Sequence, residues 1–162
     1  MTNPKYSQED FDRKDPLSIF NYSRFLIGNS LHGLIGDSVT AHNRGGKGRL
    51  GQMVEELFFK YDINSNREAD FKEAHVELKC TPLIKKDDRS SYKIKERLVC
   101  TMIDYSEIVK TKFEDSHLLA KCRLMLLLFY QHIKDYAPYD LEFIFRILWL
   151  LPEKDLLLIK KD

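Results

Sequence analysis

No stretch of this sequence is long and apolar enough to cross a bilayer as a helix. Its longest apolar runs, Leu124–Tyr130 and Phe143–Leu151, fall well short of the ~20 residues that such a helix needs. The first residues are polar, so we expect no secretory signal. The cysteines are an odd number without metal-like spacing, and each lies among apolar residues: Cys80, Cys100 and Cys122. We therefore expect a cytoplasmic protein without membrane association, whose thiols are reduced core residues.

An excess of charge of either sign is also missing. The 26 Lys and Arg residues balance 25 Asp and Glu residues, which leaves a formal net charge of +1. A basic surface over the whole chain is thereby excluded, so any binding of nucleic acid must come from local clusters. There is no internal repeat and no low-complexity segment, and 43 % of the 162 residues are hydrophobic. This balance indicates a single soluble domain, residues 1–162, with a substantial core.

The stretch Asp70–Pro82 carries the residues of most chemical interest. Apolar and polar residues alternate from Val76 to Thr81, which is the period of a β-strand. On a strand, Glu77 and Lys79 point to the same face about 7 Å apart, opposite the face that enters the core. Asp70 follows polar, turn-capable sequence, so it can enter on a neighbouring strand or turn and lie beside Glu77.

Two carboxylates and one ammonium group at one point suit metal-assisted hydrolysis of a phosphodiester. Nearby carboxylates repel each other and desolvate poorly together, and a hard divalent cation removes that penalty. A lysine beside the cation can orient an attacking water or stabilise the charge on a phosphate. The same pattern also arises by chance, as a Glu–Lys pair on an exposed strand face. The spacing alone leaves both interpretations open.

A glycine-rich basic loop, His42–Gly48, precedes a segment with apolar residues at helical spacing, Leu50–Tyr61. Backbone amides and Lys47 at a helix N-terminus can bind a phosphate, and the loop can equally be an ordinary flexible connection. It is not a Walker P-loop, because the Gly-Lys-Ser/Thr ending is absent. Within the helix, either Glu55 or Glu56 must point near the core-facing side. That carboxylate is either solvated or a further member of the metal site.

Helices are expected before the Asp70–Pro82 stretch and strands after it. Apolar spacing predicts helical segments within Leu17–Ile35, interrupted at Gly28–Gly33. Pro82 is expected to end the first strand. Further strands are expected in four apolar runs: Arg97–Asp104, Arg123–Gln131, Asp140–Leu151 and Leu156–Ile159. The run Arg97–Asp104 is expected to be covered on both faces, and Arg123–Gln131 is also compatible with a helix. Helices followed by strands indicate an α/β or α+β domain around a mixed or mainly antiparallel sheet.

The connection Lys85–Arg97 is polar and strongly basic, and it includes Lys93 and Lys95. Such a segment suits contact with a DNA backbone, although similar charge runs are usual in solvated hairpin turns. The chain stops directly after the last expected strand, Leu156–Ile159, without a closing helix. We therefore expect an N-terminal fragment of a longer protein.

Several ordered blocks resemble the MutH family, which comprises the mismatch-repair nicking endonuclease and GATC-cutting type II restriction enzymes. The blocks are Lys47–Glu55, Asp70, Val76–Pro82, Lys95–Val99, Ile103–Tyr105 and Phe113–Lys121. The resemblance implies a PD-(D/E)xK, restriction-endonuclease-like α/β fold, whose central mixed or mainly antiparallel sheet is flanked by helices. It also implies Mg²⁺-dependent cleavage of double-stranded DNA beside GATC.

The resemblance further implies a role for individual residues. The metal ligands that it implies are three carboxylates and one backbone carbonyl: Asp70, Glu77, Glu55 (directly or through water) and Leu78. It implies two active-site lysines, of which the first assists the attacking water: Lys79 and Lys121. It places Lys47 and Gly48 on a DNA-contacting loop. Ala69 stands where many nucleases of this fold have proline, which puts only the local backbone geometry in question.

The residues of Lys95–Val99 and Asp104–Glu107 are closer to the restriction enzymes than to the repair nickase. In those relatives a catalytic N-terminal domain precedes a further MutH-like domain, so the resemblance implies a missing C-terminal domain of the same protein. We therefore expect an Mg²⁺-dependent type II restriction endonuclease acting at GATC sites. Two alternatives stay open. One is a non-catalytic GATC-binding module, against which the intact acidic and basic set argues; the other is a mismatch-repair nickase regulated by a partner ATPase.

Overall fold

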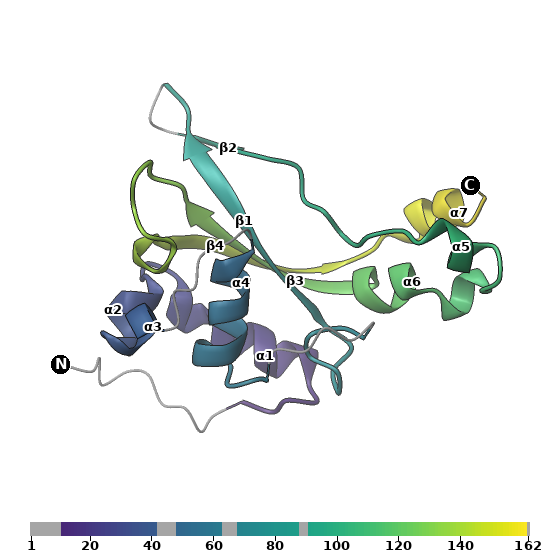
Figure 1. The fold of residues 1–162 in the computed structure, drawn as a ribbon, viewed down its shortest axis with the longest axis horizontal. Helices are drawn as coiled ribbons and strands as arrows, with labels where there is room; N and C mark the ends of the chain where they lie inside the picture. Colours follow the sequence, from purple (N-terminus) through teal and green to yellow (C-terminus); the bar gives the residue numbers. More distant parts are fainter. Residues whose placement is uncertain (1–10, 42–47, 63–67, 88–90, 162) are drawn as a thin grey trace.

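In the part of the chain that the structure describes, four strands form one mixed sheet through the centre of the molecule (Figure 1). This computed structural model describes residues 11–41, 48–62, 68–87 and 91–161. The strand order is β2-β1-β3-β4, with β1 and β3 parallel and both outer strands antiparallel to their neighbours. The strands are β1 (Glu77–Lys85), β2 (Tyr92–Ile94), β3 (Leu124–Gln131) and β4 (Phe143–Leu150). The predicted α/β class with a mixed sheet is confirmed.

The helices of the described residues are short, and most lie before β1 or beside the start of β3. The α-helices are α1 (Pro16–Tyr22), α2 (Leu31–Ile35), α3 (Ser38–Ala41), α4 (Arg49–Met53), α5 (Tyr105–Ile108), α6 (His117–Cys122) and α7 (Glu153–Lys161). Three 3₁₀ turns and one π-helical turn complete them: η1 (Ser23–Leu26), η2 (Val54–Phe58, π), η3 (Phe113–Asp115) and η4 (Pro138–Asp140).

Side-chain caps begin α1 and α2. Asp15 accepts hydrogen bonds from two backbone N–H groups of α1, and Ser30 accepts one from α2. Each cap satisfies donors that have no partner within the helix. The helical segments predicted within Leu17–Ile35 are therefore confirmed. The interruption predicted at Gly28–Gly33 is confirmed only up to Ser30, because α2 already begins at Leu31; Gly28 adopts a φ of 79° in this break and donates its N–H to the carbonyl of Phe143.

The helix predicted from the apolar spacing after Gly48 is present, but it ends at Phe58 rather than near Tyr61. Its second half is a π-helical turn, in which the N–H of Phe59 bonds the carbonyl of Val54 at 3.0 Å. A π turn shifts the side chains that follow it relative to a regular α-helix, and such turns are frequent at functional sites. Glu55 lies within this turn.

The core lies between the helices and one face of the sheet. Alternate strand residues such as Leu78, Leu126 and Leu128 face it, as the period-two pattern predicted. The helices contribute large buried side chains, among them Ile19, Leu26, Leu31, Met53 and Phe58. The opposite sheet face therefore carries Glu77 and Lys79, and it is this face that the site occupies.

The prediction that Pro82 ends regular structure is wrong. β1 continues through Pro82 to Lys85. The carbonyl of Pro82 points toward β2 and accepts a hydrogen bond from the N–H of Lys95, directly after β2. The ladder between β1 and β2 itself begins one residue later, at Leu83. The nitrogen of Pro82 faces the same side as its carbonyl, so the missing N–H removes no bond to β3.

The segment Arg97–Asp104 is not the buried strand that its apolar run predicted. It has no strand structure, and Val99 and Met102 are 64 % and 85 % exposed. The segment lies over a cavity beside β1 rather than entering the sheet. An apolar run alone does not distinguish a covered strand from an extended segment that lines a cleft.

The strand predicted at Leu156–Ile159 is also wrong, because these residues belong to α7. The helix carries Glu153 and Asp155 in its first turn and Lys160 and Lys161 in its last. This charge order is favourable for the helix dipole, and it is a helix signal that four apolar residues obscured. The expectation that the chain stops after a strand without a closing helix is corrected by the same observation.

No helix among the described residues is long and apolar enough to span a membrane. The three cysteines are free thiols, as expected, but the expectation that all three are core residues is wrong for Cys100, which lies in the extended segment Arg97–Asp104. Only Cys122 is fully buried, whereas Cys80 and Cys100 are partly exposed. Burial raises the pKa of both Cys80 and Cys122 to about 12, so these two thiols are held in the protonated form.

Candidate active site

The turn before β1 brings Asp70 back beside Glu77. Phe71 and Val76 exchange backbone hydrogen bonds of 2.9 and 3.2 Å, which close the turn. Within it, the N–H of Asp70 donates to Glu77 Oε2 at 3.3 Å. The N–H of Leu78 in turn donates to Asp70 Oδ2 at 2.9 Å. The two carboxylates are thus held next to each other by the backbone, as the sequence spacing predicted.

Lys79 lies on the same face of β1 as Glu77 and bonds it directly. Its Nζ donates to Glu77 Oε1 at 2.7 Å. Glu77 is 2 % exposed, so its charge is almost wholly removed from water. A buried carboxylate requires a charged partner close by, and the ammonium group of Lys79 supplies it.

α6 delivers a second lysine to the same carboxylate. Ser116 caps the N-terminus of α6, and the helix leads directly into β3. Since Met125 of β3 pairs in parallel with Glu77, the last turn of α6 ends beside the start of β1. Lys121 Nζ lies 3.6 Å from Glu77 Oε1 as a result. Chain segments far apart in sequence therefore meet at Glu77.

Glu55 adds a third carboxylate from the π turn of η2. It is 6 % exposed, and its Oε1 has no hydrogen-bond partner among the described residues. Burial, followed by the charges of Asp70 and Glu77, raises the pKa of Glu55 to about 7. Burial and the charge of Glu77 likewise raise the pKa of Asp70, against the lowering effect of the Leu78 N–H. Three carboxylates therefore crowd a space in which their negative charge is poorly solvated.

The oxygen chemistry of this cluster fits a hard divalent cation. In the described part of the chain, no three acidic, His or Cys side chains are already arranged as a complete ligand set. The oxygens of Asp70 and Glu77 instead bond the Leu78 N–H and Lys79. Three carboxylates beside two lysines nevertheless leave an excess of negative charge when all five groups are ionised, and Glu55 Oε1 has no hydrogen-bond partner among the described residues.

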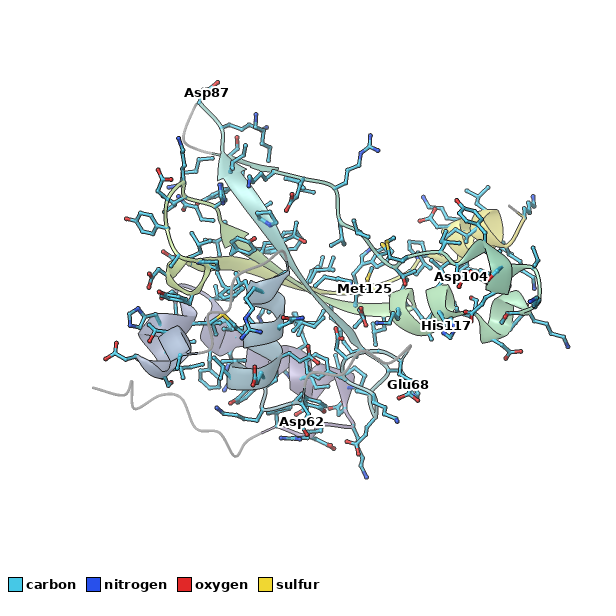
Figure 2. The ribbon with its side chains drawn as sticks, viewed as in Figure 1. Asp62, Glu68, Asp87, Asp104, His117 and Met125 are labelled. Carbon is cyan, nitrogen blue, oxygen red and sulfur yellow. The ribbon has the colours of Figure 1, made fainter. Side chains whose placement is uncertain are left out.

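Glu77 and the two lysines of the cluster, but neither Asp70 nor Glu55, line a cavity of about 810 Å³. Glu77, Lys79 and Lys121 form one wall of it, and the extended segment after Lys95 together with α5 and α6 forms the others. In Figure 2 the labelled His117 and Asp104 lie near each other in the lobe formed by α5 and α6, while Met125 lies further toward the sheet. Lys79 and Lys121, whose side chains are 23 % and 21 % exposed, are accessible from this cavity, whereas Glu77 is almost fully buried.

The predicted DNA-contacting residues are only partly described. Lys47 lies outside the described residues. Gly48 precedes α4 with a φ of 77°. Lys93 and Lys95 are exposed, on β2 and directly after it, and neither lines the cavity. Their contact with DNA stays a prediction.

Two residues of the cavity wall were missed in the sequence. His117 Nε2 lies 3.5 Å from Glu107 Oε2, and both side chains line the cavity with Lys121. His117 precedes Lys121 by one helical turn, so the two share a face of α6. The spacing of His117 and Lys121 was visible in the sequence, but the residues before His117 gave no sign that this helix lies beside β1.

The mixed sheet, the two adjacent carboxylates and the lysine two residues further along the strand define a nuclease of the restriction-endonuclease-like class. The model of the family described as DNA mismatch repair enzyme MutH matches residues 59–162. The type II restriction enzyme Sau3AI of Staphylococcus aureus is 36 % identical over 117 residues, which are 72 % of this chain and 23 % of that enzyme. The chain belongs to the MutH family. It spans less than a quarter of the length of this relative.

Proposed function

We propose that this chain is the catalytic part of an Mg²⁺-dependent type II restriction endonuclease that hydrolyses DNA at GATC sites. One observation carries the proposal: hydrogen bonds hold Asp70 beside Glu77, and the Lys79 and Lys121 ammonium groups lie 2.7 and 3.6 Å from the Glu77 carboxylate at the cavity wall. The similarity to a type II restriction enzyme supports the reaction class. The GATC site and Mg²⁺ follow from the resemblance of the motif blocks to GATC-cutting enzymes. Action on DNA and the free thiols favour a cytoplasmic location.

Asp70, Glu77, Glu55 and the carbonyl of Leu78 are the groups that we propose to hold Mg²⁺. When bound, the ion would acidify a water molecule and neutralise charge on the scissile phosphate. Even without the ion, the fold holds these carboxylates next to each other and largely removed from water. Because the raised pKa values of Glu55 and Asp70 favour protonation, these two carboxyl groups should release protons as a cation enters, and cation affinity should increase with pH.

The lysines act on the water and the phosphate. The Nζ atom of Lys79 lies 2.7 Å from Glu77 Oε1, and the lysine side chain is partly exposed to the cavity. It can therefore orient a water molecule beside the carboxylates. Its charge offsets the negative charge that develops on the phosphate during attack. Lys121 approaches the same carboxylate from α6 at 3.6 Å and can stabilise the phosphate from the other side.

Cleavage of supercoiled plasmids with and without GATC sites tests this proposal. With Mg²⁺ we expect nicked or linear product only from plasmids that contain GATC, and none in EDTA. Lys79→Ala and Asp70→Asn should abolish cleavage, and Lys79→Ala should leave DNA binding nearly intact. Lys154→Ala, which removes an exposed lysine of α7, is the matched control and should cut normally. Full activity of Lys79→Ala or Asp70→Asn would exclude the assigned roles.

A mismatch-repair nickase is the second candidate, favoured by the description of the matched family. It would prefer hemimethylated GATC, cut one strand and respond to a partner ATPase. Cleavage of both strands of unmethylated GATC duplexes favours the restriction enzyme instead. A non-catalytic GATC-binding module would bind these duplexes and leave them intact.

A further inference from the structure

The hairpin formed by β1 and β2 projects beyond the rest of the sheet (Figure 1). β1 pairs with β3 only as far as Leu83, which lies opposite Gln131, whereas β1 itself continues to Lys85. β2 pairs with these last residues of β1, and Lys86 then donates its N–H to the carbonyl of Ser91 at 2.9 Å. The hairpin therefore extends past the end of the pairing between β1 and β3.

This hairpin and the residues directly after it are basic, in a chain whose overall charge is nearly balanced. Residues 85–87 and 91–97 include five Lys and Arg residues and two acidic residues, whereas the net charge of the whole chain is +1. Lys85 and Lys86 are exposed, and neither forms an ion pair with an acidic group among the described residues. Exposed lysines without acidic partners suit the phosphates of a nucleic acid.

Lys85 leaves the sheet on the same face as the proposed catalytic residues. Side chains alternate along a strand, so those of Glu77, Lys79 and Lys85 point to one face of β1. Tyr92 lies opposite Lys85 on β2, and its ring centre is 5.9 Å from Lys85 Nζ on that face. The helices that form the core cover the opposite face. A duplex held beside Lys79 can therefore reach Lys85 without crossing the sheet.

The end of the hairpin lies further from Lys79 than the proposed recognition site is long. Lys85 follows Lys79 by six residues on β1. At about 3.3 Å per residue, the two levels are separated by about 20 Å along the strand. Base pairs of B-DNA are stacked about 3.4 Å apart, so this length corresponds to about six base pairs, whereas a site of four base pairs spans only about 10 Å.

We propose that Lys85 and Lys86 bind DNA phosphates outside the GATC site, about six base pairs from the scissile phosphate. The hairpin would then hold flanking DNA whatever its sequence, because phosphate contacts position a duplex without reading its bases. This inference rests on the proposed nuclease function, which places the scissile phosphate beside Lys79. It predicts that tight binding needs charged backbone beyond the four base pairs of the site.

Binding in EDTA to two duplexes of equal length, each with one central GATC, tests the proposal. In the second duplex, neutral methylphosphonate linkages replace the phosphates out to about eight base pairs beyond the site on both sides. The wild type should bind this duplex about tenfold more weakly, whereas Lys85→Gln/Lys86→Gln should bind both duplexes with similar, low affinity. On the charged duplex, the variant should lower the slope of log K against log salt by about 2. Lys14→Gln/Lys60→Gln, which removes two exposed lysines far from the hairpin, is the matched control and should behave like the wild type.

A wild-type chain that binds both duplexes equally, or binds neither, overturns the proposal. So does a hairpin variant that loses as much affinity on neutralisation of the flanks as the wild type does, or one that keeps the wild-type salt slope. A plasmid cleavage assay in parallel separates these outcomes from the proposed function. Binding that depends on the flanks and on the two lysines, without any cleavage in Mg²⁺, supports the hairpin contact and counts against the nuclease. Cleavage at GATC without dependence on the flanks supports the nuclease and excludes the contact.

Discussion

Glu55→Gln should make the protein more stable at alkaline pH. Burial and two neighbouring carboxylates raise the pKa of Glu55 from its ordinary 4.5 to about 7 in the folded state. The folded protein therefore binds this proton more tightly than the unfolded chain, and stability falls as the pH rises from about 4.5 to 7. A shift of this size corresponds to about 3 kcal/mol. Glutamine has no proton to release, so the variant should not show this loss.

Urea unfolding at pH 5 and pH 8, in EDTA, measures the effect. Between these values the free energy of unfolding of the wild type should fall by about 2–3 kcal/mol more than that of Glu55→Gln. Glu56→Gln, at the adjacent and less buried carboxylate, is the matched control and should behave like the wild type. Mg²⁺ at pH 8 should stabilise the wild type more than Glu55→Gln, because binding of the cation offsets the repulsion.

Equal pH dependence of the wild type and Glu55→Gln would refute this reasoning. It would mean that Glu55 is solvated in the folded state and that its carboxylate does not belong to the crowded cluster. A variant less stable than the wild type at pH 8 would also contradict the account. Such a loss would indicate that the ionised side chain makes a stabilising contact.

Three further predictions concern the site and its surroundings. Lys121→Ala should reduce cleavage and move its pH profile upward, because the Lys121 charge lowers the pKa of Glu55; cleavage rates measured against pH at one Mg²⁺ concentration below saturation check this. His32→Gln should reduce the loss of stability with rising pH near neutrality, since hydrogen bonds to two aspartates raise the pKa of His32 and stabilise the fold only while the ring is protonated. Gly48→Ala should destabilise the protein by about 1 kcal/mol, because its φ of 77° disfavours a side chain even though the space is open; urea unfolding measures it.

The central strands and the positions of Asp70, Glu77 and Lys79 were predictable from the sequence because local patterns decide them. The alternation around Glu77 fixed which residues face the core, and the apolar run Arg123–Gln131 is β3, with its ends within one residue. Asp70 was expected on a turn or strand beside Glu77, and the backbone bonds of that turn confirm it. The approach of Lys121 was implied only by family resemblance, because the parallel pairing of β1 with β3 is not visible locally.

The errors arose where tertiary surroundings decide the structure. Pro82 interrupts no pairing because its nitrogen faces the side where β2 has not yet begun to pair. Residues 99–104, which include the apolar side chains of this segment, line the cavity beside β1, and the sequence does not show that cavity. At Leu156–Ile159 four apolar residues suggested a strand, although the flanking charges have the order of a helix. The sequence also did not show which of the two adjacent glutamates is buried, because Glu55 lies in a π turn that the apolar spacing does not reveal.

Anomalous diffraction from crystals of the chain with Mn²⁺ in place of Mg²⁺ tests the central claim most directly. We predict an anomalous peak in contact with carboxylate oxygens of both Asp70 and Glu77, with Lys79 beside it. A peak that lies away from these carboxylates, or crystals saturated with Mn²⁺ that show none there, would contradict the account.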